Sequence, residues 1–131
     1  MRDLLSSVES VDPTYETQGK ELLSRFFVAH PEAKDLFAFT KTANEDDGPM
    51  RRTGAYVFKM FPQFLSLVEK NEFDDIKSFG LKYPQQASSF KLMESTFVDL
   101  VEEYSGEDLT AGQRKAFKNA FGQISAIMLN E

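Results

Sequence analysis

One tyrosine is prominent among the few side chains of this sequence that could do chemistry. Tyr83 follows Ile76 and Phe79 at helical spacing, so it shares their apolar stripe, and Pro84 directly after it prevents a regular next turn. The sequence has a single histidine, His30, far from this stripe, and no cysteine. It therefore excludes histidine-rich metal clusters, disulfides, thiolate metal sites and cysteine nucleophiles. It contains no paired-carboxylate, serine–histidine or phosphate-loop pattern.

An acidic run near residue 45 is the other group that could bind a ligand. Glu45, Asp46 and Asp47 are consecutive, and they lack the alternating oxygen ligands of a calcium loop. We therefore expect a solvated loop, whose charge the nearby Arg51 and Arg52 balance.

Length and charge narrow the possible classes of protein. The chain has 131 residues, which fits one domain over residues 1–131 that folds without a disulfide or a metal. Its formal charge of −6 and its pI near 4.9 argue against nucleic acid or an anionic membrane as a partner. No apolar run approaches the ~18 residues of a membrane span, and the N-terminus is too polar for a secretory signal. We expect a soluble, cytoplasmic protein.

Apolar residues recur at helical spacing along almost the whole chain, and no segment shows the alternating pattern of a strand. The residues described above must therefore be held in place by helices. A first apolar stripe runs from Leu4 to Val11. Residues 12–13, Asp-Pro, can then cap and start a second helix that runs to about His30. Pro31 either ends that helix or opens the next turn.

The remaining elements continue the helical pattern. Residues 40–49 predict a polar loop. Residues 57–68 predict a long helix, in which we expect Pro62 to cause a kink or a break. A short helix is expected over residues 74–83, and a helix of about four turns from Phe90 to Tyr104. The last helix follows a capping box of Thr110 and Gln113 and buries Phe117, Ala120, Phe121, Ile124 and Met128. The sequence therefore predicts an all-α protein.

Four segments, in this order, resemble the globin family. They are GKELLSRFFVAHPEAKDLF (residues 19–37), RRTGAYV (51–57), IKSFGLKY (76–83) and the tail from Phe90 to Met128, which is similar to neuroglobin-like members. The resemblance covers about residues 4–129. It implies a globin fold with a shortened loop after the third helix and a short, disturbed proximal helix.

The sequence departs from the haem-binding members at two positions. Tyr83 stands where the resemblance places the proximal histidine that binds haem iron, and Thr53 stands where a distal histidine or glutamine faces bound gas. A tyrosinate can bind haem iron, but its intrinsic pKa of about 10 requires a strong cationic partner for ionisation near neutral pH. Pro84 also favours an extended backbone at Tyr83, which redirects the ring. His30 matches a surface position of the family, so we interpret it as a solvated or capping histidine.

A globin that has lost haem must fill its pocket, because an empty pocket of at least ~300 Å³ would cost on the order of 7 kcal/mol. Seven residues are expected to line or fill this pocket, and they are Leu23, Phe37, Thr53, Val57, Phe61, Phe79 and Phe90. In this interpretation Tyr83 is a core tyrosine whose hydroxyl has a backbone partner. The space that remains could take a fatty acid or another apolar molecule.

Three functions follow, in this order of preference. The first is a degenerate globin that is not an enzyme and has no cofactor. It would act as a sensor or interaction domain with an apolar small molecule in its residual pocket, and its protein partner is unknown. The alternative is a haem-binding globin with Tyr83 as the axial ligand and Thr53 on the distal side, which would bind oxygen or another small gas. A peroxidase-like enzyme comes third, because Thr53 is a poor acid–base group.

Overall fold

Helices are the only regular secondary structure over residues 2–37 and 48–130, which are the residues that the structure, a computed structural model, describes. The elements are α1 (Arg2–Val11), α2 (Glu16–Ala29), the 3₁₀-helix η1 (Pro31–Leu36), α3 (Gly48–Glu69), α4 (Asp74–Lys82), α5 (Pro84–Leu92), α6 (Glu94–Ser105) and α7 (Ala111–Met128). The all-α prediction is confirmed. Residues 40–47 of the predicted loop lie outside the described residues, as does most of the shortened loop expected after the third helix. Residues 48 and 49 already belong to α3.

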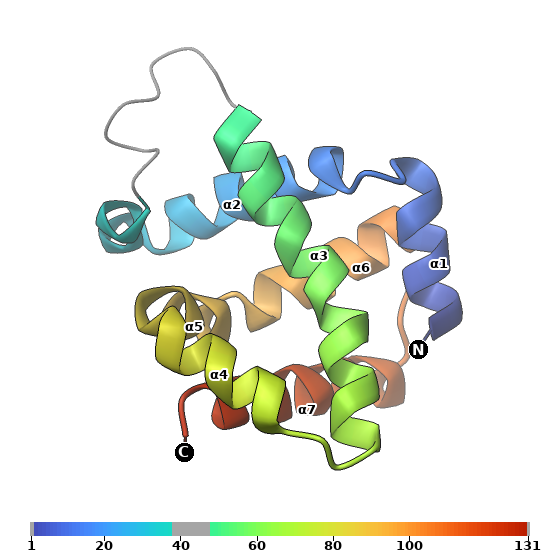
Figure 1. Cartoon of the computed structure of the whole chain (residues 1–131). Helices are drawn as coiled ribbons and strands as arrows, with labels where there is room; N and C mark the ends of the chain where they lie inside the picture. The colour runs from blue at the N-terminus through green and yellow to red at the C-terminus, as the bar shows by residue number, and fades with distance from the viewer. Residues whose placement is uncertain (1, 38–47, 131) are drawn as a thin grey trace.

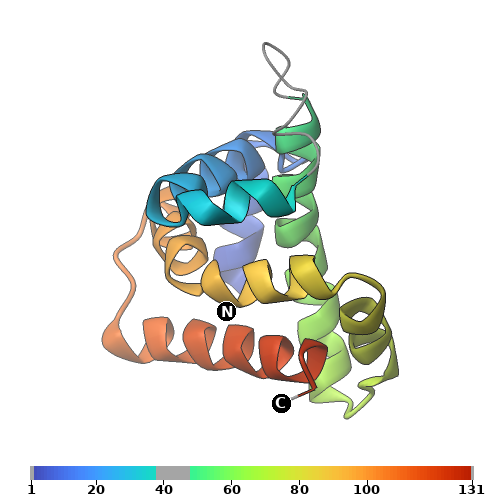
Figure 2. The same ribbon diagram turned by 90° about the vertical axis from the view of Figure 1, so that its left-hand side faces the viewer.

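The long helix α3 connects the two ends of the molecule. Its N-terminal half crosses α2, and its C-terminal half reaches α7 (Figure 1). Helix α7 runs along the far end of the molecule and contacts α4, α5 and α6 (Figure 2). Phe79 of α4 stacks on Tyr56 in the N-terminal half of α3, so α4, which ends at the junction with Tyr83, lies beside this half of α3. Within the described ranges, no helix has the length and apolarity that crossing a membrane would require.

Two glycines allow α2 and α3 to touch through their backbones. A Cβ atom on Gly19 would lie 2.2 Å from the backbone nitrogen of Ala55, and one on Gly54 would lie 2.1 Å from the carbonyl oxygen of Gly19. Any side chain at either position would therefore push the helices apart. Because Thr53 is next to Gly54, this crossing also fixes the position of Thr53.

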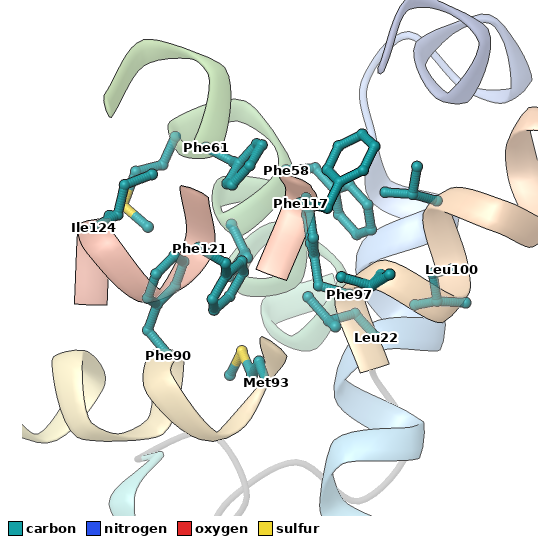
Figure 3. Close-up of a cluster of buried hydrophobic side chains, with 14 of the residues drawn as sticks. Leu22, Phe58, Phe61, Phe90, Met93, Phe97, Leu100, Phe117, Phe121 and Ile124 are labelled. Carbon is teal, nitrogen blue, oxygen red and sulfur yellow. The ribbon is translucent and has the colours of Figure 1, made fainter. Parts of the chain in front are cut away.

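Phenylalanine rings fill the centre between α3, α5, α6 and α7 (Figure 3). Phe97 of α6 is fully buried, and its ring centroid lies 5.0 Å from that of Phe58 and 4.9 Å from that of Phe61. Phe90 stacks on Phe121 with a centroid distance of 4.0 Å and an interplanar angle of 8°. Aromatic pairs contribute about 0.5–1.5 kcal/mol each beyond the area that they bury. The ring cluster is thus the main packing unit of the core.

The second helix begins later than the sequence predicts. Residues 12–13 form a turn, and α2 starts at Glu16 after Tyr15, whose φ of 61° is left-handed. The Asp12 carboxylate still caps this helix, since it accepts a hydrogen bond from the backbone N–H of Thr17 at 3.0 Å. The capping role was therefore correct, while the start of the helix was placed three residues too early.

Other proline and boundary predictions need correction. Of the kink or break expected at Pro62, the break does not occur: helix α3 continues through this proline, because the loss of one hydrogen bond is outweighed by buried side chains on both sides of it. The helix expected from Phe90 to Tyr104 is divided at Met93, and its first part begins at Pro84. A proline is well tolerated at the first position of a helix, where its missing N–H has no intrahelical partner. Val11, the last residue of the first stripe, is 50% exposed rather than buried.

The predictions for the last helix are confirmed. The backbone N–H of Gln113 donates to the hydroxyl of Thr110 at 3.1 Å, and the backbone N–H of Thr110 donates to the Gln113 side chain at 2.9 Å. This is the complete capping box that the sequence predicts. All five residues expected to be buried along α7 are buried.

The Asp12 cap predicts a pH dependence of stability. Hydrogen bonds from Thr14, through its hydroxyl first, and from Thr17 hold the pKa of Asp12 well below its usual value of about 4. A carboxyl whose pKa is lowered by folding stabilises the protein above the unfolded pKa and loses this contribution as the pH falls toward the folded pKa. We expect Asp12→Asn to lower the urea midpoint at pH 7, by an amount that shrinks below about pH 4. The exposed Asp108→Asn is the control, and a pH-independent difference for Asp12→Asn would contradict the linkage.

Candidate functional site

Two adjoining cavities lie between α3, α4 and α5. The outer cavity is open to solvent, has a volume of about 430 Å³ and is lined by Arg52, Thr53, Tyr56, Phe79, Tyr83 and Gln86. The inner cavity is more enclosed, is almost wholly apolar and has a volume of about 60 Å³. Four of these side chains, Thr53, Tyr56, Phe79 and Gln86, line both spaces. The two cavities therefore meet at these four side chains.

The structure brings most of the expected pocket residues together. Five of the seven line the inner cavity, and they are Phe37, Thr53, Val57, Phe79 and Phe90. Leu23 and Phe61 line neither cavity, and each is 0% exposed within the core. Phe61 lies 6.2 Å from Phe117 and 5.9 Å from Phe121 between ring centroids. It therefore fills the core rather than facing a ligand.

Sequence reasoning missed five of the lining residues, which are Arg52, Tyr56, Met60, Gln86 and Met93. Arg52, Tyr56 and Met60 are four residues apart, so they form one face of α3 next to Thr53. That spacing could have identified them. Gln86 was missed because the segment after Pro84 was expected to interrupt the helix rather than to begin one.

Tyr83 lies at the junction of α4 and α5. It is the residue between the two helices, with φ of −129° and ψ of 65°, and its extended φ is the one that a following proline favours. Its side chain is 40% exposed, and its hydroxyl has no hydrogen-bond partner among the described residues. The interpretation of Tyr83 as a core tyrosine with a backbone partner is therefore wrong.

The cation nearest to Tyr83 in sequence does not reach its oxygen. The Lys82 ammonium lies over the Tyr83 ring, 5.4 Å from the centroid, which is a cation–π position. His30 lies between α2 and η1, with its Nδ1 3.4 Å from a carboxylate oxygen of Glu32, and it lines neither cavity. This position agrees with its interpretation as a partly solvated, terminal residue.

Phe79 is the centre of an aromatic row between α3 and α4. Its ring stacks on Tyr56 of α3 with centroids 6.1 Å apart and an interplanar angle of 23°. It also contacts Tyr83 at 5.2 Å and Phe64 at 5.9 Å. The Tyr56 and Phe79 rings therefore occupy the space between the two helices, at the point where the outer cavity meets the inner one.

These residues do not fit a haem held through a proximal imidazole. A porphyrin between α3 and α4 would have to displace the stacked Tyr56 and Phe79 rings. The inner cavity of about 60 Å³ has room for only about four to six water-sized molecules at roughly 10–15 Å³ each. No histidine lines either cavity, and no group of three or more His, Cys, Asp or Glu residues in the described ranges could hold a metal ion.

Comparisons with known proteins agree with this helical arrangement. The family model described as Globin matches residues 20–128, from within α2 to the end of α7, and this range contains both cavities. Myoglobin from Sarda chiliensis is 29% identical over 124 residues, which cover 88% of this chain and 82% of that protein. No solved structure gives a significant match. Because the family model matches most of its length, this chain belongs to the globin family.

Proposed function

We propose that this globin works without a conventionally bound haem, as a sensor or interaction domain that takes an apolar small molecule into its inner cavity. The observation that supports this most directly is the pair of Tyr56 and Phe79 rings between α3 and α4, with an apolar cavity behind them. Neither cavity is lined by an imidazole. The proposal includes no catalytic activity, no nucleic-acid partner and no membrane partner.

The size of the inner cavity favours a ligand over an empty space. A void of about 60 Å³ costs about 1.5 kcal/mol at ~24 cal/mol per Å³. Val57, Phe90 and Met93 lie on its wall, and each gains dispersion contacts when an apolar group fills it. A small apolar group is therefore stabilised there, although the gain is modest.

Absorbance spectroscopy with haemin tests the haem-free part of this proposal. We expect no Soret band in the purified protein and only weak, non-saturating haemin uptake. The uptake should be equal in the wild type, in Tyr83→Phe and in the control Tyr104→Phe, whose side chain lines neither cavity. A sharp Soret band at one haem per chain would overturn the proposal.

The apolar-ligand part of the proposal predicts that decan-1-ol binds saturably and raises the melting temperature of the protein.

The alternative function is gas binding by a haem with Tyr83 as its axial ligand. Two observations favour it: Tyr83 and Thr53 both line the outer cavity, and the volume of about 430 Å³ is typical of ligand pockets. This alternative predicts a Soret band that is lost or shifted in Tyr83→Phe but not in Tyr104→Phe. The same titration therefore distinguishes the two functions.

A further inference from the structure

The helices around the outer cavity differ in charge from the chain as a whole. Residues 48–68 and 76–93 comprise α5 and most of α3 and α4, and they contain no aspartate or glutamate. They contain six basic residues, which are Arg51, Arg52, Lys59, Lys77, Lys82 and Lys91. The formal charge of the whole chain is −6, and the acidic run at 45–47 lies outside the described residues. With Glu69, Asp74 and Asp75 at their other ends included, α3, α4 and α5 together carry a formal charge of +3, and the part of them around the cavity is cationic in an acidic protein.

One of these cations lies on the wall of the outer cavity. Arg52 is the charged member of the six residues that line it, and no carboxylate is among them. Arg52 is exposed and forms no ion pair with any described residue. A guanidinium that has no carboxylate partner can donate two parallel hydrogen bonds to an anionic group.

Hydroxyl and amide groups line the same cavity as this arginine. Thr53, Tyr56 and Tyr83 contribute hydroxyls, and Gln86 contributes an amide. The hydroxyls of Tyr56 and Tyr83 have no hydrogen-bond partner within residues 2–37 and 48–130. The mouth of the cavity therefore offers several donors beside a positive charge, which suits the oxygens of a carboxylate.

The inner cavity adds an apolar compartment directly behind this mouth. The two cavities share Thr53, Tyr56, Phe79 and Gln86, so a molecule that lies along Phe79 can reach both. The inner volume of about 60 Å³ accepts a narrow chain end and not a ring system. A ligand that uses both compartments has an anionic group at one end and a slender apolar chain at the other.

We infer that the ligand of this site is a single-chain amphipathic carboxylate. Its head group binds Arg52 and the surrounding hydroxyls, and its chain passes between Tyr56 and Phe79 into the inner cavity. The inference rests on the proposed function, and it adds the chemical class of the molecule that the cavity takes. The aromatic pair separates when the chain enters, since it occupies the boundary between the two cavities.

Calorimetric titration with three matched single-chain ligands tests this inference. Decanoate, decan-1-ol and decyltrimethylammonium have unbranched alkyl chains of nearly the same length and differ in head-group charge. We expect saturable binding of decanoate at one molecule per chain, about fivefold or more tighter than decan-1-ol, and weakest binding of decyltrimethylammonium. Arg52→Ala should weaken decanoate about five- to tenfold and leave decan-1-ol unchanged. This loss of affinity is at the low end of the range for charged hydrogen bonds, because the pair of Arg52 and the carboxylate is exposed to solvent.

A second basic residue of α3 provides the control. Lys59 is exposed, lies two turns after Arg52 and lines neither cavity, so Lys59→Ala should change the affinity of neither ligand. Equal effects of Arg52→Ala and Lys59→Ala, or equal affinities for decanoate and decan-1-ol, would overturn the inference and leave the proposed function intact. Binding of neither ligand would overturn both. Displacement of bound decanoate by one equivalent of haemin, with a Soret band, would assign the site to haem instead.

Discussion

Replacing Phe97 by alanine is expected to lower the free energy of unfolding by about 3–5 kcal/mol. The side chain is 0% exposed, and its ring contacts those of Phe58, Phe61 and Phe121 from two other helices. Alanine would leave a void that these rings cannot close, because each is itself held by further neighbours. Since typical domains are stable by 5–15 kcal/mol, this variant should be close to unfolding.

Urea denaturation, monitored by far-ultraviolet circular dichroism, measures this loss of unfolding free energy. Leu81→Ala is the control, because Leu81 is 80% exposed on α4 and should change the free energy of unfolding by less than about 0.5 kcal/mol. Phe97→Leu should cost less than Phe97→Ala, since leucine fills part of the void. A loss below about 1 kcal/mol for Phe97→Ala would mean that the ring cluster is not the main packing unit of the core.

The phenylalanine content explains both the stability of the core and the shape of the site. In the sequence, the rings on helical stripes predicted the filling of a globin pocket. The structure places them differently. Phe61 is fully buried in the central cluster, Phe79 lines the inner cavity, and Phe90 does both, since it stacks on Phe121 and also lines that cavity. Periodicity identifies which face of a helix is apolar, but it does not tell whether that face meets another helix or a cavity.

Local signals predicted the elements well wherever a single interaction decides the boundary. The capping box at Thr110 fixed the start of α7, because the two residues that form it are only three apart. The start of α2 was missed because it depends on tertiary packing. Tyr15 takes a left-handed conformation while its ring stacks on Phe58, 5.8 Å away on another helix. No pattern within residues 12–16 indicates that contact.

The junction at Tyr83 was only partly predictable for a similar reason. Pro84 correctly indicated an end to α4 and an extended φ at Tyr83. Proline is equally compatible with the first position of a new helix, and here α5 begins at once. The immediate restart places Gln86, Phe90 and Met93 on one face, and this face completes the inner cavity. An interruption after Pro84 would have left that wall open.

Close backbone contact between α2 and α3 predicts a second large effect. Gly54→Ala should lower the free energy of unfolding by about 3 kcal/mol, because its Cβ would lie 2.1 Å from the carbonyl oxygen of Gly19. Neither backbone can yield locally, so the helices must separate. Thr53 would move with α3, and we therefore expect ligand affinity to fall together with stability. Urea denaturation measures the stability, and decan-1-ol titration measures the effect on the cavity.

A double substitution distinguishes this mechanism from a general loss of helix packing. Gly19→Ala should cost about as much as Gly54→Ala, and the double variant should cost clearly less than their sum, because one separation of the helices accommodates both methyl groups. Gly122→Ala is the matched control, since that glycine is exposed on α7 and its Cβ would come no closer than 3.6 Å to the Glu94 side chain. It should stabilise the protein by about 0.5–1 kcal/mol through helix propensity. Strictly additive losses at Gly19 and Gly54 would show that the two positions act independently, and that the crossing does not set the position of the cavity wall.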